Sequence, residues 1–187
     1  MHVQQSFEVI RFVGQNGKYH IVMDSVEGEL LVSYLHKQES MSKRFFLRFI
    51  TNLAKELEYL EKSNAAEYVP YLTPFHVVLK ENNSVAFLKC SERYNKKIEK
   101  TLEQFLPIDG TENYYYSFGR MIQYILMKMR LRPRLTRGEE RRIRRIIAKC
   151  MTLKQKKRFQ SAEEIRAQLV TVRKRKRATT VENCFAQ

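Results

Sequence analysis

The chain has 187 residues, of which 43% are hydrophobic and 29% charged, a composition typical of a globular domain and not of a disordered segment. Its 35 Lys and Arg residues outnumber its 20 Asp and Glu residues, which gives a net charge of +15. No apolar run approaches the about 20 residues that a transmembrane helix needs, and the first residues lack the pattern of a secretory signal. Three widely separated cysteines predict neither a disulfide framework nor a zinc site, so we expect a cytoplasmic protein with Cys90 and Cys150 as buried thiols.

The chain opens with the pattern of a β-hairpin. Residues 7–13 and 19–23 are rich in β-branched and aromatic side chains, as is typical of strands. An Asn-Gly dipeptide lies between them, and this dipeptide favours a tight hairpin turn because both residues accept positive φ. We therefore predict two antiparallel strands, after which Gly28 permits a turn into a short helix or strand over residues 30–35.

A long core helix is predicted over residues 43–62, because apolar residues recur there at the spacing of one helical face. A second hairpin follows, with strands at residues 77–79 and 85–88. On the predicted helix, the side opposite the apolar stripe carries Arg48, Lys55, Glu58 and Glu61.

The second half of the chain is predicted to be a loop followed by helices. Residues 89–113 are polar and irregular, as expected for a long loop, and helices are predicted over residues 115–129 and 139–151. A further helix should start after Ser161, since Ser161 and Glu164 have the spacing of a capping box. The helix over 139–151 is amphipathic, and its outer side carries Arg141, Arg142, Arg144, Arg145 and Lys149.

Positive charge is concentrated in the C-terminal third of the chain. Residues 120–177 contain 21 Lys and Arg residues and four acidic residues, a net charge of +17, whereas the remainder has a net charge of −2. A field of one sign on this scale attracts anionic partners. Nucleic acid, an anionic membrane surface and an acidic or phosphorylated protein are all compatible with it.

Five segments of the chain resemble, in the correct order, segments of a protein kinase that has lost most of its N-terminal lobe. They are similar to the last N-lobe strand with the hinge, the long helix before the catalytic loop, the catalytic loop itself, a later core helix, and the C-terminal helices. The segments are residues 19–28 (YHIVMDSVEG), 53–60 (LAKELEYL), 71–79 (YLTPFHVVL), 115–119 (YYSFG), and 146–151 with 158–165 (IIAKCM and RFQSAEEI).

The resemblance implies an α+β fold, mainly α, in which a kinase-like C-lobe follows a β-hairpin remnant of the N-lobe. Residues 1–26 would be that remnant with the hinge, residues 27–172 the helical C-lobe, and residues 173–187 a flexible basic tail. Tyr116 would pack in the core, as the matching Tyr does in kinases. A different reading of residues 114–116 is a tyrosine platform for stacking nucleic-acid bases.

The resemblance also implies that phosphoryl-transfer chemistry is missing. Tyr71 stands at the position of the catalytic Asp, and a phenol with a pKa of about 10 is a poor base at neutral pH. His76 and Lys89 stand at the positions of the two metal-binding residues, and neither offers the oxygen ligand that Mg²⁺ prefers. Only 18 residues precede the hinge-like segment, which leaves no room for the glycine-rich loop and its strand lysine. We therefore expect a pseudokinase, with no enzymatic activity, cofactor or metal site, that acts in protein binding or regulation.

Two alternatives remain open: a nucleic-acid-binding protein that uses the basic third, and, less favoured, an active Ser/Thr kinase completed by another chain. The basic run after residue 173 is also suited to an anionic membrane surface, so a membrane-peripheral location is compatible with it. Thr179 is a candidate phosphorylation site, because basic residues stand two and three positions before it. The predicted surface for a partner consists of Arg141, Arg142, Arg144, Arg145, Lys174, Arg175, Lys176 and Arg177.

Overall fold

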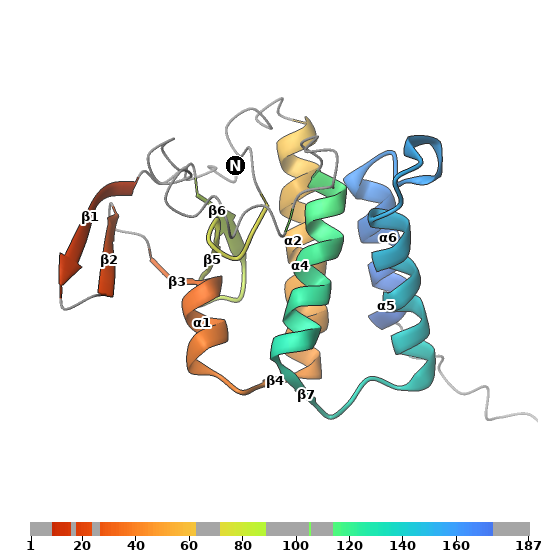
Figure 1. Ribbon diagram of the computed structural model, residues 1–187. Coiled ribbons are helices and arrows are strands. Elements are labelled where there is room, and N and C mark those ends of the chain that lie inside the picture. The colour runs from red at the N-terminus through yellow and green to blue at the C-terminus, as the bar shows by residue number, and fades with distance from the viewer. Residues whose placement is uncertain are drawn as a thin grey trace, which may run out of the picture.

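The computed structural model describes residues 9–15, 18–23, 27–62, 72–88, 105 and 114–173. These residues form an α+β fold dominated by helices, as predicted (Figure 1). The described helices are α1 (Leu31–Lys37), α2 (Lys43–Lys62), α4 (Tyr114–Lys128), α5 (Arg137–Cys150) and α6 (Ala162–Arg173), with a 3-10 turn, η3 (Gln155–Lys157). The described strands are β1 (Val9–Gln15), β2 (Lys18–Met23), β3 (Glu29–Leu30), β4 (Ser40–Ser42), β5 (Val77–Leu79), β6 (Val85–Phe87) and β7 (Arg130–Arg132).

The predicted first hairpin is confirmed. Strands β1 and β2 pair antiparallel, and the last pair of their register joins Gln15 to Lys18. Only the Asn-Gly dipeptide lies between these two residues in the sequence, which is the length that a tight hairpin connection requires. Figure 1 shows the hairpin beyond β3 and α1, to one side of the four longer helices.

The second predicted hairpin is also confirmed, and it belongs to a three-stranded sheet. Strands β5 and β6 pair antiparallel, and the two-residue strand β3 pairs with β5 on its other edge. The segment predicted as a helix or strand therefore contributes both, because β3 leads directly into α1. Gly28, just before β3, has φ +137°, and a Cβ atom there would lie 2.4 Å from the Leu79 carbonyl oxygen, so this position requires glycine.

Helix α2 has the predicted bounds and is the central element of the core. Its apolar stripe is buried, and one continuous hydrophobic cluster joins it to α1, α4, α5 and α6. The prediction for its polar side was wrong at Glu58, which is only 9% exposed. Helix α6 packs along this flank of α2, and Arg166 of α6 donates a hydrogen bond to Glu58 Oε2 at 2.5 Å. The carboxylate is thus buried because α6 packs against α2, and the apolar periodicity within α2 alone cannot predict this contact.

The next two helices lie close to their predicted positions, with α4 and α5 each starting one or two residues earlier than expected. Tyr116 was predicted to pack in the core, but it is only partly buried and is not among the described side chains that pack against the core cluster. Tyr114 and Tyr115 pack against the core instead, because they lie three and four residues before the fully buried Phe118, on the same face of α4. Cys150 is buried as predicted, and burial raises the pKa of its thiol to about 12.

Helix α6 begins where the sequence predicts, but only half of the expected capping box forms. The Ser161 hydroxyl accepts a hydrogen bond from the Glu164 backbone N–H at 3.3 Å. The carboxylate of Glu164 instead forms an ion pair with Lys149 on α5, at 3.4 Å. A carboxylate of α2 supplies the second cap, because Glu61 Oε2 accepts from the backbone N–H of Ala162 at 3.0 Å.

One short strand pairing was not predicted. Strands β4 and β7 pair in parallel, with Ser40 opposite Arg130. This pairing ties the segment before α2 to the segment after α4 and so closes one end of the helical body (Figure 1). Among the described helices, none combines the length and the apolar character needed to cross a bilayer. The predicted long loop lies outside the described residues apart from Phe105, which is 3% exposed.

Candidate interaction surface

Helix α5 carries the predicted surface, and a capping box that was not predicted fixes its start. Thr136 Oγ1 accepts from the Glu139 backbone N–H at 3.3 Å, and Glu139 Oε2 accepts from the Thr136 N–H at 2.7 Å. Glu139 also forms an ion pair with Lys43 at the start of α2, at 3.1 Å. Partial burial raises the pKa of Glu139, but the hydrogen bonds from Thr136 and the charge of Lys43 outweigh this and hold it below its ordinary value. The T-x-x-E spacing was the available signal, and it starts the helix at Arg137.

Beyond its first turn, α5 has one apolar and one cationic side. Ile143, Ile146 and Cys150 are buried against the core, as predicted. Arginines that recur every four residues are exposed on the other side, each about 6 Å from the next along the helix axis. We call this row the α5 ridge, and it consists of Arg137, Arg141 and Arg145. None of the three forms an ion pair or a hydrogen bond through its side chain with another residue in the described part of the chain.

Two of the four predicted arginines differ from this row, because they have partners within the molecule. Arg142 donates a hydrogen bond to the backbone carbonyl of Thr171, at 2.8 Å, and so ties α5 to the last turns of α6. Arg144 forms an ion pair with Glu140 one turn earlier, at 2.6 Å. Both of these side chains are largely exposed, so the pair contributes little to stability and can exchange for an external anion. Of the four predicted arginines, Arg141 and Arg145 therefore have no partner among the described residues, whereas Arg142 and Arg144 do.

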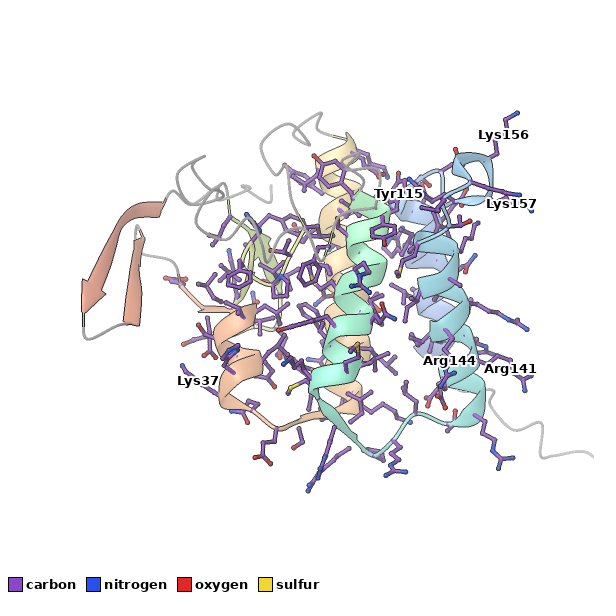
Figure 2. The ribbon with its side chains drawn as sticks, viewed as in Figure 1. Lys37, Tyr115, Arg141, Arg144, Lys156 and Lys157 are labelled. Atoms are coloured by element: carbon purple, nitrogen blue, oxygen red, sulfur yellow. The ribbon has the colours of Figure 1, made fainter. Side chains whose placement is uncertain are left out.

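Further cations extend the surface past both ends of α5. Figure 2 shows Arg141 and Arg144 along the first half of the helix, and Lys156 and Lys157 beyond its other end, at η3. All four side chains are exposed. The segment that leads into α5 adds the exposed Arg130, Arg132 and Arg134.

Acidic residues do little to neutralise this surface. Between residues 130 and 157 the only two are Glu139 and Glu140, and both are already engaged with cations. The surface therefore presents a positive potential along α5 up to its last turn, where Lys149 pairs with Glu164 of α6.

The remaining predicted site residues lie outside the described part of the chain. These are Tyr71, Lys89, Thr179 and the basic run of Lys174, Arg175, Lys176 and Arg177. The described chain ends at Arg173, two residues after the carbonyl that Arg142 binds. In the sequence, the basic run therefore continues directly from the helix end that is tied to α5.

Of the three predicted replaced positions, Tyr71, His76 and Lys89, only His76 lies among the residues that the structure describes. Its side chain is fully buried, and its Nδ1 atom lies 2.8 Å from the Thr73 hydroxyl. Its backbone N–H donates to the Thr73 carbonyl, and its carbonyl accepts from the Leu88 N–H at the end of β6. His76 thus fastens the turn before β5 to the hairpin, and one ring nitrogen is already engaged in a hydrogen bond. Among the described residues, no three His, Cys, Asp or Glu side chains are arranged to hold a metal ion.

Comparison with known proteins does not identify a family for this chain. No protein-family model matches the chain, and no curated protein matches it. The function is therefore inferred from the chain's own contacts and charges.

Proposed function

We propose that the chain is a kinase-like module that lacks phosphoryl-transfer chemistry and acts by binding a protein partner. Support comes from the order of the elements, since a hairpin, a long core helix, a second hairpin and three further described helices follow one another as the resemblance implies. Support also comes from His76, which the resemblance assigns to the position of the Mg²⁺-binding amide of kinases and which is a buried imidazole that shares a hydrogen bond with Thr73. A fold alone does not set function, so the binding role needs a surface of its own.

The observation that carries the binding role is the α5 ridge. Its three guanidinium groups are exposed and have no partner among the described residues. A guanidinium donates paired N–H groups to one carboxylate or phosphate, which gives strong, directional hydrogen bonds. The nearest acids on α5 are already engaged, so an incoming anion meets little repulsion. The partner is accordingly an acidic or phosphorylated protein segment.

The missing chemistry is tested by thermal unfolding in the presence of MgATP. We expect no change in Tm at millimolar nucleotide, with an active kinase as the positive control. A nucleotide present at 100 times its Kd would stabilise the fold by about 2.7 kcal/mol, which a melting curve resolves easily. A Tm that rises with MgATP concentration would contradict the proposal.

The binding surface is tested by removing two charges from the α5 ridge and, separately, two from another helix. The ridge variant is Arg141→Gln/Arg145→Gln, and the matched control is Arg44→Gln/Lys55→Gln on α2, where both side chains are exposed. On a heparin column, we expect the ridge variant to elute at clearly lower salt than the control, although their net charges are equal. Equal elution would mean that net charge alone drives retention, and the ridge would be refuted as a site.

Nucleic acid is the second candidate partner, favoured by the net charge of +17 in residues 120–177. The same two variants distinguish it, with a labelled single-stranded oligonucleotide as the probe. If two phosphate contacts are lost, the slope of log K against log salt should fall by about 1.4, since each contact accounts for about 0.7. A slope that is equal in wild type and ridge variant would exclude nucleic acid as the partner of the ridge.

A further inference from the structure

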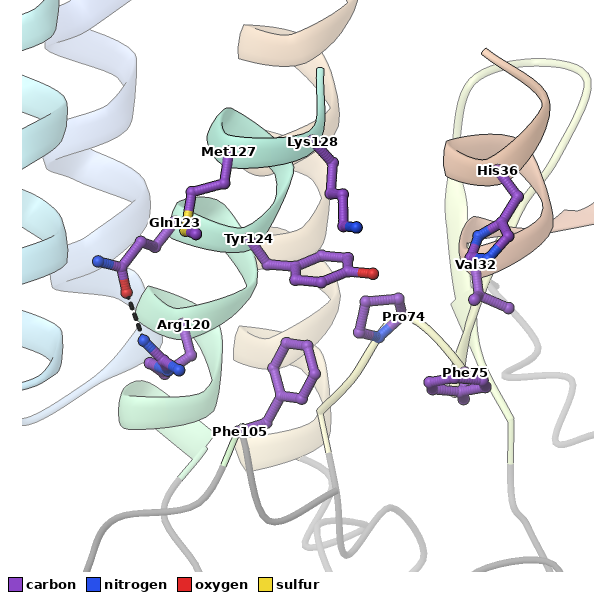
Figure 3. A pocket seen from close by; sticks show the side chains of 10 residues that line it. All are labelled: Val32, His36, Pro74, Phe75, Phe105, Arg120, Gln123, Tyr124, Met127 and Lys128. Carbon is purple, nitrogen blue, oxygen red and sulfur yellow. Dashed lines mark hydrogen bonds between the residues drawn. The ribbon is translucent and has the colours of Figure 1, made fainter. Parts of the chain in front are cut away.

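A pocket of about 490 Å³ opens between α1 and α4, and its volume lies within the range of about 300–1,000 Å³ that is typical of small-ligand sites. Side chains of both helices line it, and the turn before β5 closes it from below (Figure 3). A different side of α4 contacts α5. Gly119 lies against Cys150 of α5, whereas the side that lines the pocket carries Arg120, Tyr124 and Met127. The pocket is therefore separate from the α5 ridge.

The walls of the pocket are largely apolar and aromatic. The ring of Tyr124 meets Phe105 edge-on, with 5.6 Å between ring centroids and an interplanar angle of 62°. Pro74 lies opposite Tyr124, and Figure 3 shows Phe75 beside it below α1. Buried Phe105 and Pro74 give fixed surfaces against which a flat or branched apolar group can pack.

One apolar side chain at the mouth of the pocket is unusually exposed. Met127 is 78% exposed, the highest value among the large hydrophobic side chains whose exposure the structure describes. Methionine has three rotatable bonds and a polarizable sulfur, so it can adapt to the shape of a bound group. A ligand that covered Met127 would therefore gain contact area without requiring movement of the backbone.

The ionisable side chains that line the pocket include cations but no carboxylate among the described residues. The Lys128 ammonium lies 5.8 Å from the centroid of the Tyr124 ring, and it forms no ion pair with any described residue. Arg120 is the second cation, and its Nη1 donates to Gln123 Oε1 at 2.7 Å (Figure 3). Among the described residues, an anion held near Lys128 would thus meet positive charge and no competing carboxylate.

We propose that this pocket binds a small organic anion with an aromatic or branched apolar body and a carboxylate group. The body packs between the Tyr124–Phe105 pair and Pro74, while Met127 covers it from the solvent side. The carboxylate accepts hydrogen bonds from the Lys128 ammonium at the mouth. This binding site goes beyond the proposed partner surface and uses none of its residues.

The test uses 2-naphthoate as the probe and naphthalene-2-carboxamide as its uncharged match, with affinities measured by calorimetry and ligand-observed NMR. We expect the carboxamide to bind at least about tenfold more weakly, because its neutral carbonyl oxygen accepts a weaker hydrogen bond from the ammonium than a carboxylate does. Equal affinities, or no naphthoate binding at millimolar concentration, would overturn the proposal.

Three variants locate the binding. Lys128→Gln should weaken naphthoate about tenfold and the carboxamide much less, whereas Met127→Ser should weaken both probes. Lys156→Gln, an exposed cation near η3, should affect neither. Naphthoate affinity that is unchanged in Lys128→Gln would overturn the proposal. The α5 ridge variant should bind naphthoate as the wild type does. Lys128→Gln should still elute from heparin at higher salt than the ridge variant. The pocket proposal and the proposed function can therefore fail independently.

Discussion

Gly119 shows how a single missing side chain sets the distance between two helices. A Cβ atom at this position of α4 would lie 2.7 Å from Cys150 Cβ and 2.9 Å from Met151 Cγ. We expect Gly119→Ala to destabilise the protein by up to about 2 kcal/mol, because overpacking costs about 1–3 kcal/mol and the gain in helix propensity offsets only about 1 kcal/mol of it. Urea unfolding measures the difference.

The matched control for this substitution lies in the chain itself. Gly138 is in the first turn of α5, and a Cβ atom there would meet nothing within 4 Å. Gly138→Ala should therefore leave stability unchanged or raise it by about 0.5–1 kcal/mol through helix propensity. A Gly119→Ala protein as stable as Gly138→Ala would show that α4 and α5 do not pack as closely as described.

At the scale of elements, two carboxylates of α2 hold the C-terminal helix in place. Glu58 accepts from Lys62 at 2.6 Å and from Arg166 of α6 at 2.5 Å. The hydrogen bond from Lys62, together with that from Arg166, lowers the pKa of Glu58. Glu61 adds a hydrogen bond from the Tyr115 hydroxyl of α4, at 2.6 Å. The same stretch of α2 therefore binds α4 and α6 at once.

Replacing Glu58 with Gln should destabilise the protein at neutral pH by about 1 kcal/mol, a modest value because both cationic partners remain accessible to water. A carboxylate whose pKa is lowered by folding stabilises the fold above its unfolded pKa, and this contribution is lost as pH falls through the folded pKa. The difference between wild type and Glu58→Gln should accordingly shrink below about pH 4. Denaturant unfolding at several pH values checks this.

The control is Glu163→Gln, which replaces an exposed acid on α6. A difference in stability between wild type and Glu58→Gln that stays constant down to acid pH would contradict the stabilising role of the Glu58 carboxylate.

At the scale of the whole molecule, repulsion among cations should limit stability. The described part of the chain contains six ion pairs, yet the net charge is +15 and the α5 ridge is unpaired. Raising NaCl from about 0.01 M to about 0.15 M shortens the Debye length from about 30 Å to about 8 Å. We expect Tm to rise by about 2–4 °C, which corresponds to about 1 kcal/mol for a protein of this size. The ridge variant should show a smaller rise, and a Tm that falls with salt would contradict the prediction.

The sequence by itself determined the elements whose patterns are local. Helix α2, both hairpins and the apolar side of α5 lie where periodicity and turn residues predict them, because these signals arise from neighbours along the chain. The outward position of Arg141 and Arg145 follows from the same periodicity. Helix α5 starts two residues before the predicted residue 139, because the T-x-x-E capping box at Thr136 sets its start.

Only the tertiary structure decided which of these side chains are available. Arg142 is engaged by a carbonyl of α6, and Glu58 is covered by α6, although within their own helices both face away from the apolar stripe. The pairing of β4 with β7 and the pocket between α1 and α4 likewise join segments more than 80 residues apart. The physical reason is that burial and pairing depend on how distant helices pack together, whereas a pattern within one helix reports only its own faces.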